Sequence, residues 1–165
     1  MNRTMIAATL CLLVTSSVHS GELDSFVAPI EGTTAAWSRV YDATHMAQHP
    51  DQQVEAMDLA VTFEIFDPTY DGQVNFELKV KLRNGTKGVT TGTCMGQGDS
   101  MWCGVECDGG GMVISHRSNG SVLADLEKVG FIRMSEVGCG EEDTGVSFSL
   151  ESGKDDKQFL LHKKS

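Results

Sequence analysis

The residues of this chain with the most definite chemistry are its five cysteines. One of them, Cys11, lies in an apolar run near the N-terminus, and the other four are Cys94, Cys103, Cys107 and Cys139. Their spacing lacks the two C-x₂₋₄-C pairs of a structural zinc site, so zinc is the less favoured interpretation. An even number of cysteines in an exported chain favours disulfides, and the sequence therefore predicts two of them.

Four cysteines allow three pairings, and strand geometry chooses among them. A two-residue turn at Gly98-Asp99 would place Cys94 directly opposite Cys103, where a Cα separation of about 4.5–5.5 Å suits a disulfide. If Cys103 and Cys107 share one strand, about 13 Å separates them, because a strand rises about 3.3 Å per residue. We therefore predict the pairs Cys94–Cys103 and Cys107–Cys139.

Two histidines have a spacing that could bind a metal ion. His45 and His49 are four positions apart, so on a helix both imidazoles would face the same side. His49 precedes Pro50, however, and such pairs are also common on solvated surfaces. His45 and His49 are the candidate metal ligands, while the sequence as a whole predicts no bound metal and no cofactor.

Catalytic groups are present only as isolated residues. The chain contains no Gly-x-Ser-x-Gly elbow, no P-loop and no His-Glu-x-x-His helix. A secreted hydrolase would have to use His45, Ser100 or an acidic pair, and nothing in their spacing brings them into one pocket. We therefore assign no catalytic residue.

The segment between Met57 and Leu82 alternates between apolar and polar residues, which is typical of two β-strands that each have one solvated face. Such strands belong to an antiparallel sheet over a single core. Glu64 and Glu77 are expected to face solvent. The side chains expected on the inner face are Leu59, Val61, Phe63, Val74, Phe76, Leu78, Val80, Val146, Phe148 and Leu150.

Further short strands follow, separated by turn residues such as Asn84-Gly85 and Asn119-Gly120. Sequential hairpins of about eight strands predict an all-β meander that closes as a small up-and-down barrel, and a two-sheet sandwich is the alternative. Ahead of these strands, the spacing of Trp37, Val40, Tyr41 and Thr44 predicts a short helix over 34–48. The expected strands are Gly88–Cys94, Met101–Cys107, Met112–Arg117, Val122–Leu126, Val129–Met134, Val146–Leu150 and Phe159–His162.

The N-terminal residues have the pattern of a secretory signal. Arg3 precedes an apolar run, and Val18-His19-Ser20 presents suitable residues to a signal peptidase. The expected organisation is a signal peptide at 1–20, a helical or irregular segment at 21–56 and the β-domain at 57–165. No apolar segment is long enough to span a membrane, so we expect a secreted or periplasmic protein.

Signal cleavage is the first testable prediction. We expect it after Ser20, because Val18 and Ser20 occupy the two positions that the peptidase recognises. N-terminal sequencing of the exported protein should begin at Gly21. Recovery of intact Met1, or of a lipid on Cys11, would contradict both the location and the disulfide argument.

The net charge of −10, which becomes −11 once Arg3 is removed, disfavours nucleic acid and anionic lipid as partners. The expected function is a non-catalytic binding module for a small apolar ligand or for a protein partner. A structural or interaction protein of the cell envelope is the alternative, and a secreted hydrolase is the third hypothesis. A hollow interior would favour a small ligand, whereas a packed interior would favour surface recognition.

Overall fold

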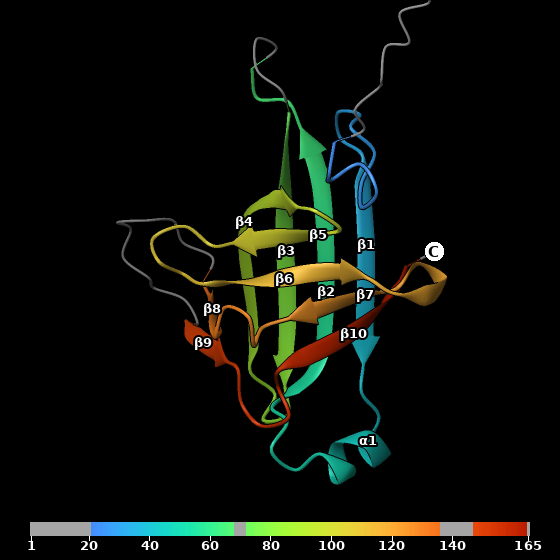
Figure 1. Ribbon diagram of the computed structural model, residues 1–165. Helices are drawn as coiled ribbons and strands as arrows, with labels where there is room; N and C mark the ends of the chain where they lie inside the picture. The colour runs from blue at the N-terminus through green and yellow to red at the C-terminus, as the bar shows by residue number, and fades with distance from the viewer. Residues whose placement is uncertain (1–20, 68–71, 136–146, 165) are drawn as a thin grey trace, which may run out of the picture.

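The computed structural model describes residues 21–67, 72–135 and 147–164. These residues form strands and one short α-helix (Figure 1), and none of their helices is long and apolar enough to cross a membrane. In chain order the elements are β1 (Thr34–Val40), α1 (Ala43–Gln48), β2 (Val54–Glu64), β3 (Gln73–Leu82), β4 (Lys87–Gln97), β5 (Ser100–Gly104), β6 (Gly111–His116), β7 (Val122–Asp125), β8 (Phe131–Met134), β9 (Phe148–Glu151) and β10 (Gln158–Lys163).

Eight of the strands form a closed antiparallel barrel in the order β1-β10-β7-β6-β5-β4-β3-β2. Each strand pairs with its neighbours in sequence except where β8 and β9 intervene between β7 and β10. The barrel closes where β10 pairs with β1, with Ser38 opposite His162. The predicted all-β meander barrel is confirmed, and the sandwich alternative is wrong, because closure leaves the sheet with no free edges.

Strand register agrees with the alternation in the sequence. Leu59 lies opposite Leu78, and Val61 lies opposite Phe76. All four of these side chains are at most 2% exposed, so they form the centre of the core. The predicted inner face is confirmed for Leu59, Val61, Val74, Phe76, Leu78 and Val80, while Phe63 is half-buried at the end of β2.

The predicted helix over 34–48 is wrong in its first half. Residues Thr34–Val40 form β1, which pairs with β2 along its whole length, and only Ala43–Gln48 are helical. Trp37 faces the core opposite Leu59 and is 2% exposed. Sheet pairing on both sides of β1 outweighs a local helical pattern, because strand formation depends on neighbours more than on intrinsic preference. The barrel therefore includes residues ahead of Met57.

Strands β8 and β9 form a separate two-stranded sheet rather than part of the barrel. Assigning Phe148 and Leu150 to a barrel strand was therefore wrong, and Val146 lies outside the described residues. This ribbon nevertheless packs on the barrel core, since Ile132 and Leu150 are 1% and 4% exposed. Any side chain at Gly88 of β4 would collide with Phe148, which shows how closely the ribbon approaches the barrel wall.

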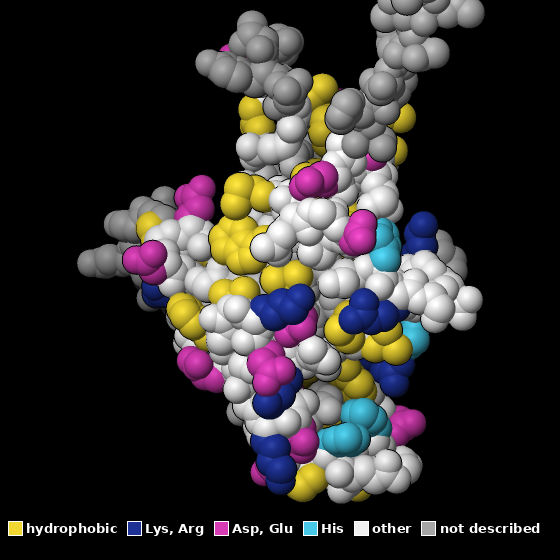
Figure 2. Space-filling view, viewed as in Figure 1, with side chains coloured by type: hydrophobic (Ala, Val, Ile, Leu, Met, Phe, Trp, Pro, Cys, Tyr) yellow, Lys and Arg dark blue, Asp and Glu magenta, His cyan; other side chains and the backbone are white. Residues whose placement is uncertain are grey.

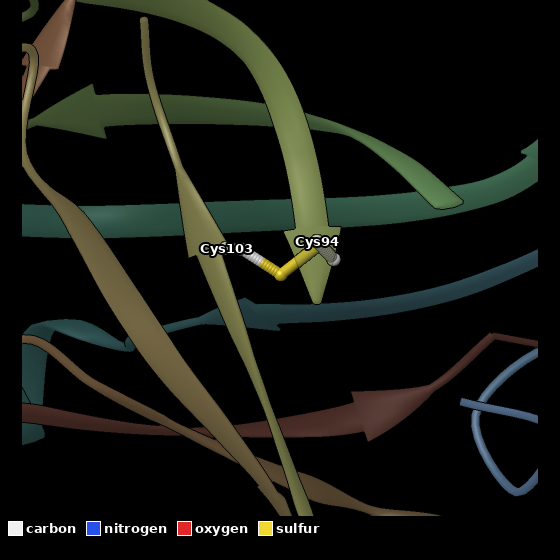
Figure 3. The surroundings of a disulfide bond; sticks show 2 residues. All are labelled: Cys94 and Cys103. Carbon is white, nitrogen blue, oxygen red and sulfur yellow. A yellow bond between two sulfur atoms is a disulfide. The ribbon is translucent and has the colours of Figure 1, made fainter. Parts of the chain in front are cut away.

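The disulfide between Cys94 and Cys103 joins β4 to β5 (Figure 3). Gln97 pairs with Ser100 around a two-residue turn, which places the two cysteines in register with their Cα atoms 4.0 Å apart. This predicted pair is confirmed. Cys107 lies beyond the end of β5, has a φ of 56° and is also disulfide-bonded. Cys139 lies outside the described residues, so its pairing with Cys107 stays a prediction.

Candidate functional site

Among the described residues, the inward side chains of the barrel form one packed core cluster. A void in this part of the chain lies between the barrel and the β8–β9 ribbon, lined by apolar side chains that include Met57, Met112, Leu126 and Phe159. Its volume is about 10 Å³, which is about the least that a single water molecule requires. An apolar void of this size offers no space for a fatty acid, a sterol or any other small apolar ligand.

The chain ahead of β1 lies beside the upper ends of β1 and β2 in the view of Figure 1. Phe26 and Val27 are 5% and 4% exposed and belong to the same core cluster as the inward strand residues. The Phe26 ring stacks on the His116 ring with centroids 4.0 Å apart, and His116 Nε2 lies 3.0 Å from Ser25 Oγ. These contacts pack the segment ahead of β1 against the end of β6 and against the core.

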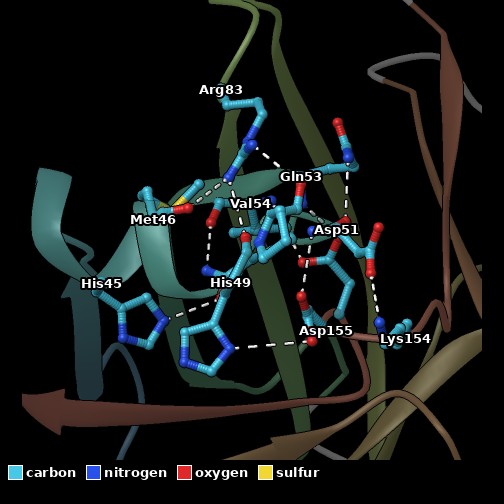
Figure 4. A network of polar contacts seen from close by, with 12 residues as sticks. His45, Met46, His49, Asp51, Gln53, Val54, Arg83, Lys154 and Asp155 are labelled. Carbon is cyan, nitrogen blue, oxygen red and sulfur yellow. Dashed lines mark hydrogen bonds and ion pairs between the residues drawn. The ribbon is translucent and has the colours of Figure 1, made fainter.

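The lower end, where α1 lies, is held by a polar network (Figure 4). The Arg83 guanidinium donates hydrogen bonds to the carbonyl oxygens of Met46, His49 and Pro50 at 3.0–3.1 Å. The last carbonyl groups at the C-terminal end of a helix have no partner within it. A cation there satisfies them and interacts favourably with the negative end of the helix dipole. Arg83 therefore fastens α1 to the β3–β4 turn, which is a structural role.

Asp156 anchors the start of β2 within the same network. Its carboxylate accepts hydrogen bonds from the backbone N–H groups of Gln53 and Val54 at 2.6 and 3.3 Å. The residue is 3% exposed, and this burial raises the pKa of Asp156 above its ordinary value although the two hydrogen bonds act to lower it. The folded protein therefore favours the protonated form of this carboxyl more than the unfolded chain does.

A dependence of stability on pH follows from Asp156. Well below the ordinary aspartate pKa of about 4 the carboxyl is neutral in both states, and its effect is absent. As the pH rises through the raised pKa, the folded state must hold a buried charge, so stability falls. We expect the thermal midpoint of Asp156→Asn, measured relative to that of the wild type, to increase as the pH is raised from acidic to neutral. A difference that stays constant across the titration would contradict this assignment.

Of the candidate metal ligands, His45 lies in α1 and His49 is its C-cap residue, and their rings stack with centroids 4.3 Å apart. His45 also stacks on Tyr41, and His45 Nε2 lies 3.0 Å from Gln52 Oε1. His49 Nδ1 lies 3.9 Å from Asp155 Oδ1. Within the described ranges no three His, Cys, Asp or Glu side chains are grouped so that they could hold a metal ion. The stacked rings instead pack α1 against the end of β1.

Ser100 and His45, two of the groups that a hydrolase would need, lie on separate elements. Ser100 is the first residue of β5, and its hydroxyl donates to the Gln97 carbonyl at 2.9 Å, whereas His45 lies in α1. Asp42 caps α1 by accepting a hydrogen bond from the His45 backbone N–H at 2.8 Å. Asp42 and His45 thus mark the start of a helix, because aspartate is a favoured N-cap residue.

Sequence reasoning missed one arrangement of catalytic type. Ser121 Oγ lies 3.2 Å from His162 Nδ1, and the guanidinium of Arg39 contacts His162 Nε2. Arginine can only donate, so His162 Nε2 must accept and its Nδ1 carries the proton. A histidine that acts as general base turns its unprotonated nitrogen toward the serine and donates its other N–H to a carboxylate. Here the protonated nitrogen faces the serine and an arginine takes the place of the carboxylate. The contact between Arg39 and His162 joins β1 to β10, where the barrel closes.

The outer wall carries apolar side chains across β4 and β5, where Figure 2 shows them gathered. Met95 lies opposite Trp102, and Trp102 lies opposite Val113 on β6, so the three form one row. Met95 is 59% exposed, Trp102 is half-buried and Val113 is 4% exposed. A side chain at Gly104 would collide with the Trp102 ring, so the indole lies flat on the sheet.

A second exposed apolar cluster, which we call the apolar tip, consists of Ile30, Ile65 and Phe66. These side chains are 65%, 43% and 72% exposed. The tip stands at the upper end, where β2 finishes and the chain approaches β1. Its position could not be read from the sequence, because Ile65 continues the alternation of core residues beyond the end of the barrel.

Comparison of the chain with protein-family models, with curated proteins and with solved structures found no match. The candidate site therefore rests on geometry. Among the described residues the interior is packed and the polar networks have structural roles, while the outer surface carries exposed apolar side chains on the wall and at the tip.

Proposed function

We propose that this protein is a secreted or periplasmic binding module without catalytic activity, which recognises a protein partner through its outer surface. The observation that supports the proposal is the packed core among the described residues, where the void beside the β8–β9 ribbon has a volume of about 10 Å³, too small for a small-molecule ligand. Between a small apolar ligand and a protein, a packed interior favours the protein. The Cys94–Cys103 disulfide is consistent with an oxidising compartment.

Exposed apolar side chains on a rigid scaffold are a recognised feature of protein interaction surfaces. Four large apolar side chains are more than half exposed, namely Phe66, Val40, Ile30 and Met95. Closure leaves the barrel sheet without a strand edge for β-augmentation, so a partner that binds the barrel has to contact side chains on its wall or at its ends.

The test uses the exported protein in the cells that produce it. A carbodiimide joins carboxylates to amines without a spacer, which suits a surface rich in Asp and Glu. We expect a covalent adduct with a second polypeptide, and we expect native mass spectrometry of the uncoupled protein to give the mass of the mature chain alone. A co-purifying molecule of a few hundred daltons, or only uncoupled monomer, would overturn the proposal.

A further inference from the structure

Two chain segments build the apolar tip side by side. The Gly32 N–H donates to the Phe63 carbonyl at 2.9 Å, and the Ile65 N–H donates to Glu31 Oε2 at 2.5 Å. The pairing of β1 with β2 thus continues beyond Thr34 and places Ile30 beside the end of β2. A tip fixed by these hydrogen bonds loses little conformational entropy when it binds, which favours its use as an anchor.

The surroundings of the tip are acidic. Glu31 follows Ile30, and Glu64 precedes Ile65, while residues 21–38 and 54–78 contain no Lys or Arg. Neither Glu31 nor Glu64 forms an ion pair within the described part of the chain. Figure 2 shows acidic side chains but no Lys or Arg on the uppermost part of the face it presents. The tip therefore combines exposed apolar area with negative potential.

We propose that the apolar tip docks into an apolar pocket of a cationic protein, with Glu31 and Glu64 facing Lys or Arg side chains at the pocket rim. The inference deepens the proposed function by naming the surface and the class of partner. Phe66, the most exposed of the three side chains, is the anchor, and the carboxylates steer the encounter and reject acidic proteins.

Charge also argues against the other occupants. A second copy of this chain would bring Glu31 and Glu64 against their own counterparts, in a protein whose net charge is already −10. A membrane surface would have to accept the same carboxylates, which anionic lipids repel and which apolar lipid does not solvate. A cationic protein is the occupant whose charge complements this surface.

The test places a benzophenone amino acid at position 66 of the exported protein and, as a matched control, at position 40. Val40 and Phe66 are both 72% exposed, and Val40 lies at the other end of the barrel. On illumination we expect position 66 to form an adduct with a protein of net positive charge and position 40 to form none. A homodimer, a lipid adduct, an acidic protein, or adducts from position 40 alone would each overturn the inference.

Binding measurements on the purified partner complete the test. Phe66→Ser should weaken binding at least about tenfold, whereas Val40→Ser should not. The pair Glu31→Gln and Glu64→Gln keeps an acceptor at each position and should slow association about tenfold at low salt, with the difference lost near about 1 M salt. Glu151→Gln is the charge control. A partner that binds all variants equally would overturn the inference.

The two proposals fail separately. A carbodiimide adduct with a second polypeptide but no adduct at position 66 would leave the proposed function standing and remove the tip as its docking surface. Absence of both adducts would remove the two proposals together.

Discussion

Replacement of Phe76 by alanine is expected to lower the free energy of unfolding by about 3–5 kcal/mol, the usual cost of emptying a buried aromatic position. Phe76 is 2% exposed in the middle of β3, opposite Val61 on one side and Gly92 on the other. A Cβ added at Gly92 would lie 2.8 Å from the Phe76 ring, so the ring already occupies the space above that glycine. Gly92 has no side chain that could fill the void left by alanine.

Glu77→Ala is the matched control for Phe76→Ala. Glu77 is the next residue of the same strand, its side chain is 44% exposed, and its carboxylate contacts Lys79 Nζ at 2.6 Å. Exposed ion pairs contribute little to stability, so this change should be small. Urea unfolding of both variants gives the comparison. A larger loss for Glu77→Ala than for Phe76→Ala would contradict the register of β3 and every inside and outside assignment that depends on it.

The second large effect concerns the disulfides. Cys94 and Cys103 are separated by nine positions, and loop-closure entropy gives a loop of this size about 2.7 kcal/mol. Cys107 and Cys139 lie 32 positions apart, which corresponds to about 3.7 kcal/mol if they pair. Replacement of Cys107 and Cys139 by serine should therefore lower stability more than replacement of Cys94 and Cys103. Thermal unfolding of the two double variants under oxidising conditions measures the order.

Peptide mapping without reduction decides the connectivity behind that prediction. We expect one peptide pair joined through Cys94 and Cys103 and another through Cys107 and Cys139. Four free thiols in the exported protein would contradict both bridges and the assignment to an oxidising compartment. Equal losses in the two double variants would show that loop length does not set their contributions.

The sequence predicted the fold where hydrophobic contrast is strong. Strands β2 and β3 alternate between residues such as Phe76 and Glu77, so both the strands and their register follow from a period of two. The Cys94–Cys103 pair was predictable as well, because Gly98-Asp99 sets the register of one hairpin. In both cases the information is local to one or two adjacent strands.

Prediction failed where structure depends on distant contacts. Ala36, Ser38 and Arg39 give β1 little hydrophobic contrast, and only its pairing with β2 and β10 makes it a strand. The β8–β9 ribbon has a strand-like sequence pattern, but its pairing outside the barrel depends on tertiary contacts. The apolar tip was missed for a related reason, since an exposed Phe66 and a buried Phe76 look alike until burial is known.

The two tryptophans give the molecule a pair of optical reporters. Trp37 is 2% exposed, and its indole N–H donates to the Gly120 carbonyl at 2.8 Å, which ties β1 to the connection between β6 and β7. Its emission should lie at short wavelength and shift to the red only when the barrel opens. Trp102 lies half-exposed on the outer wall, so its emission responds to solvent there. One fluorescence spectrum can therefore follow unfolding and coverage of the wall as separate bands, without any label.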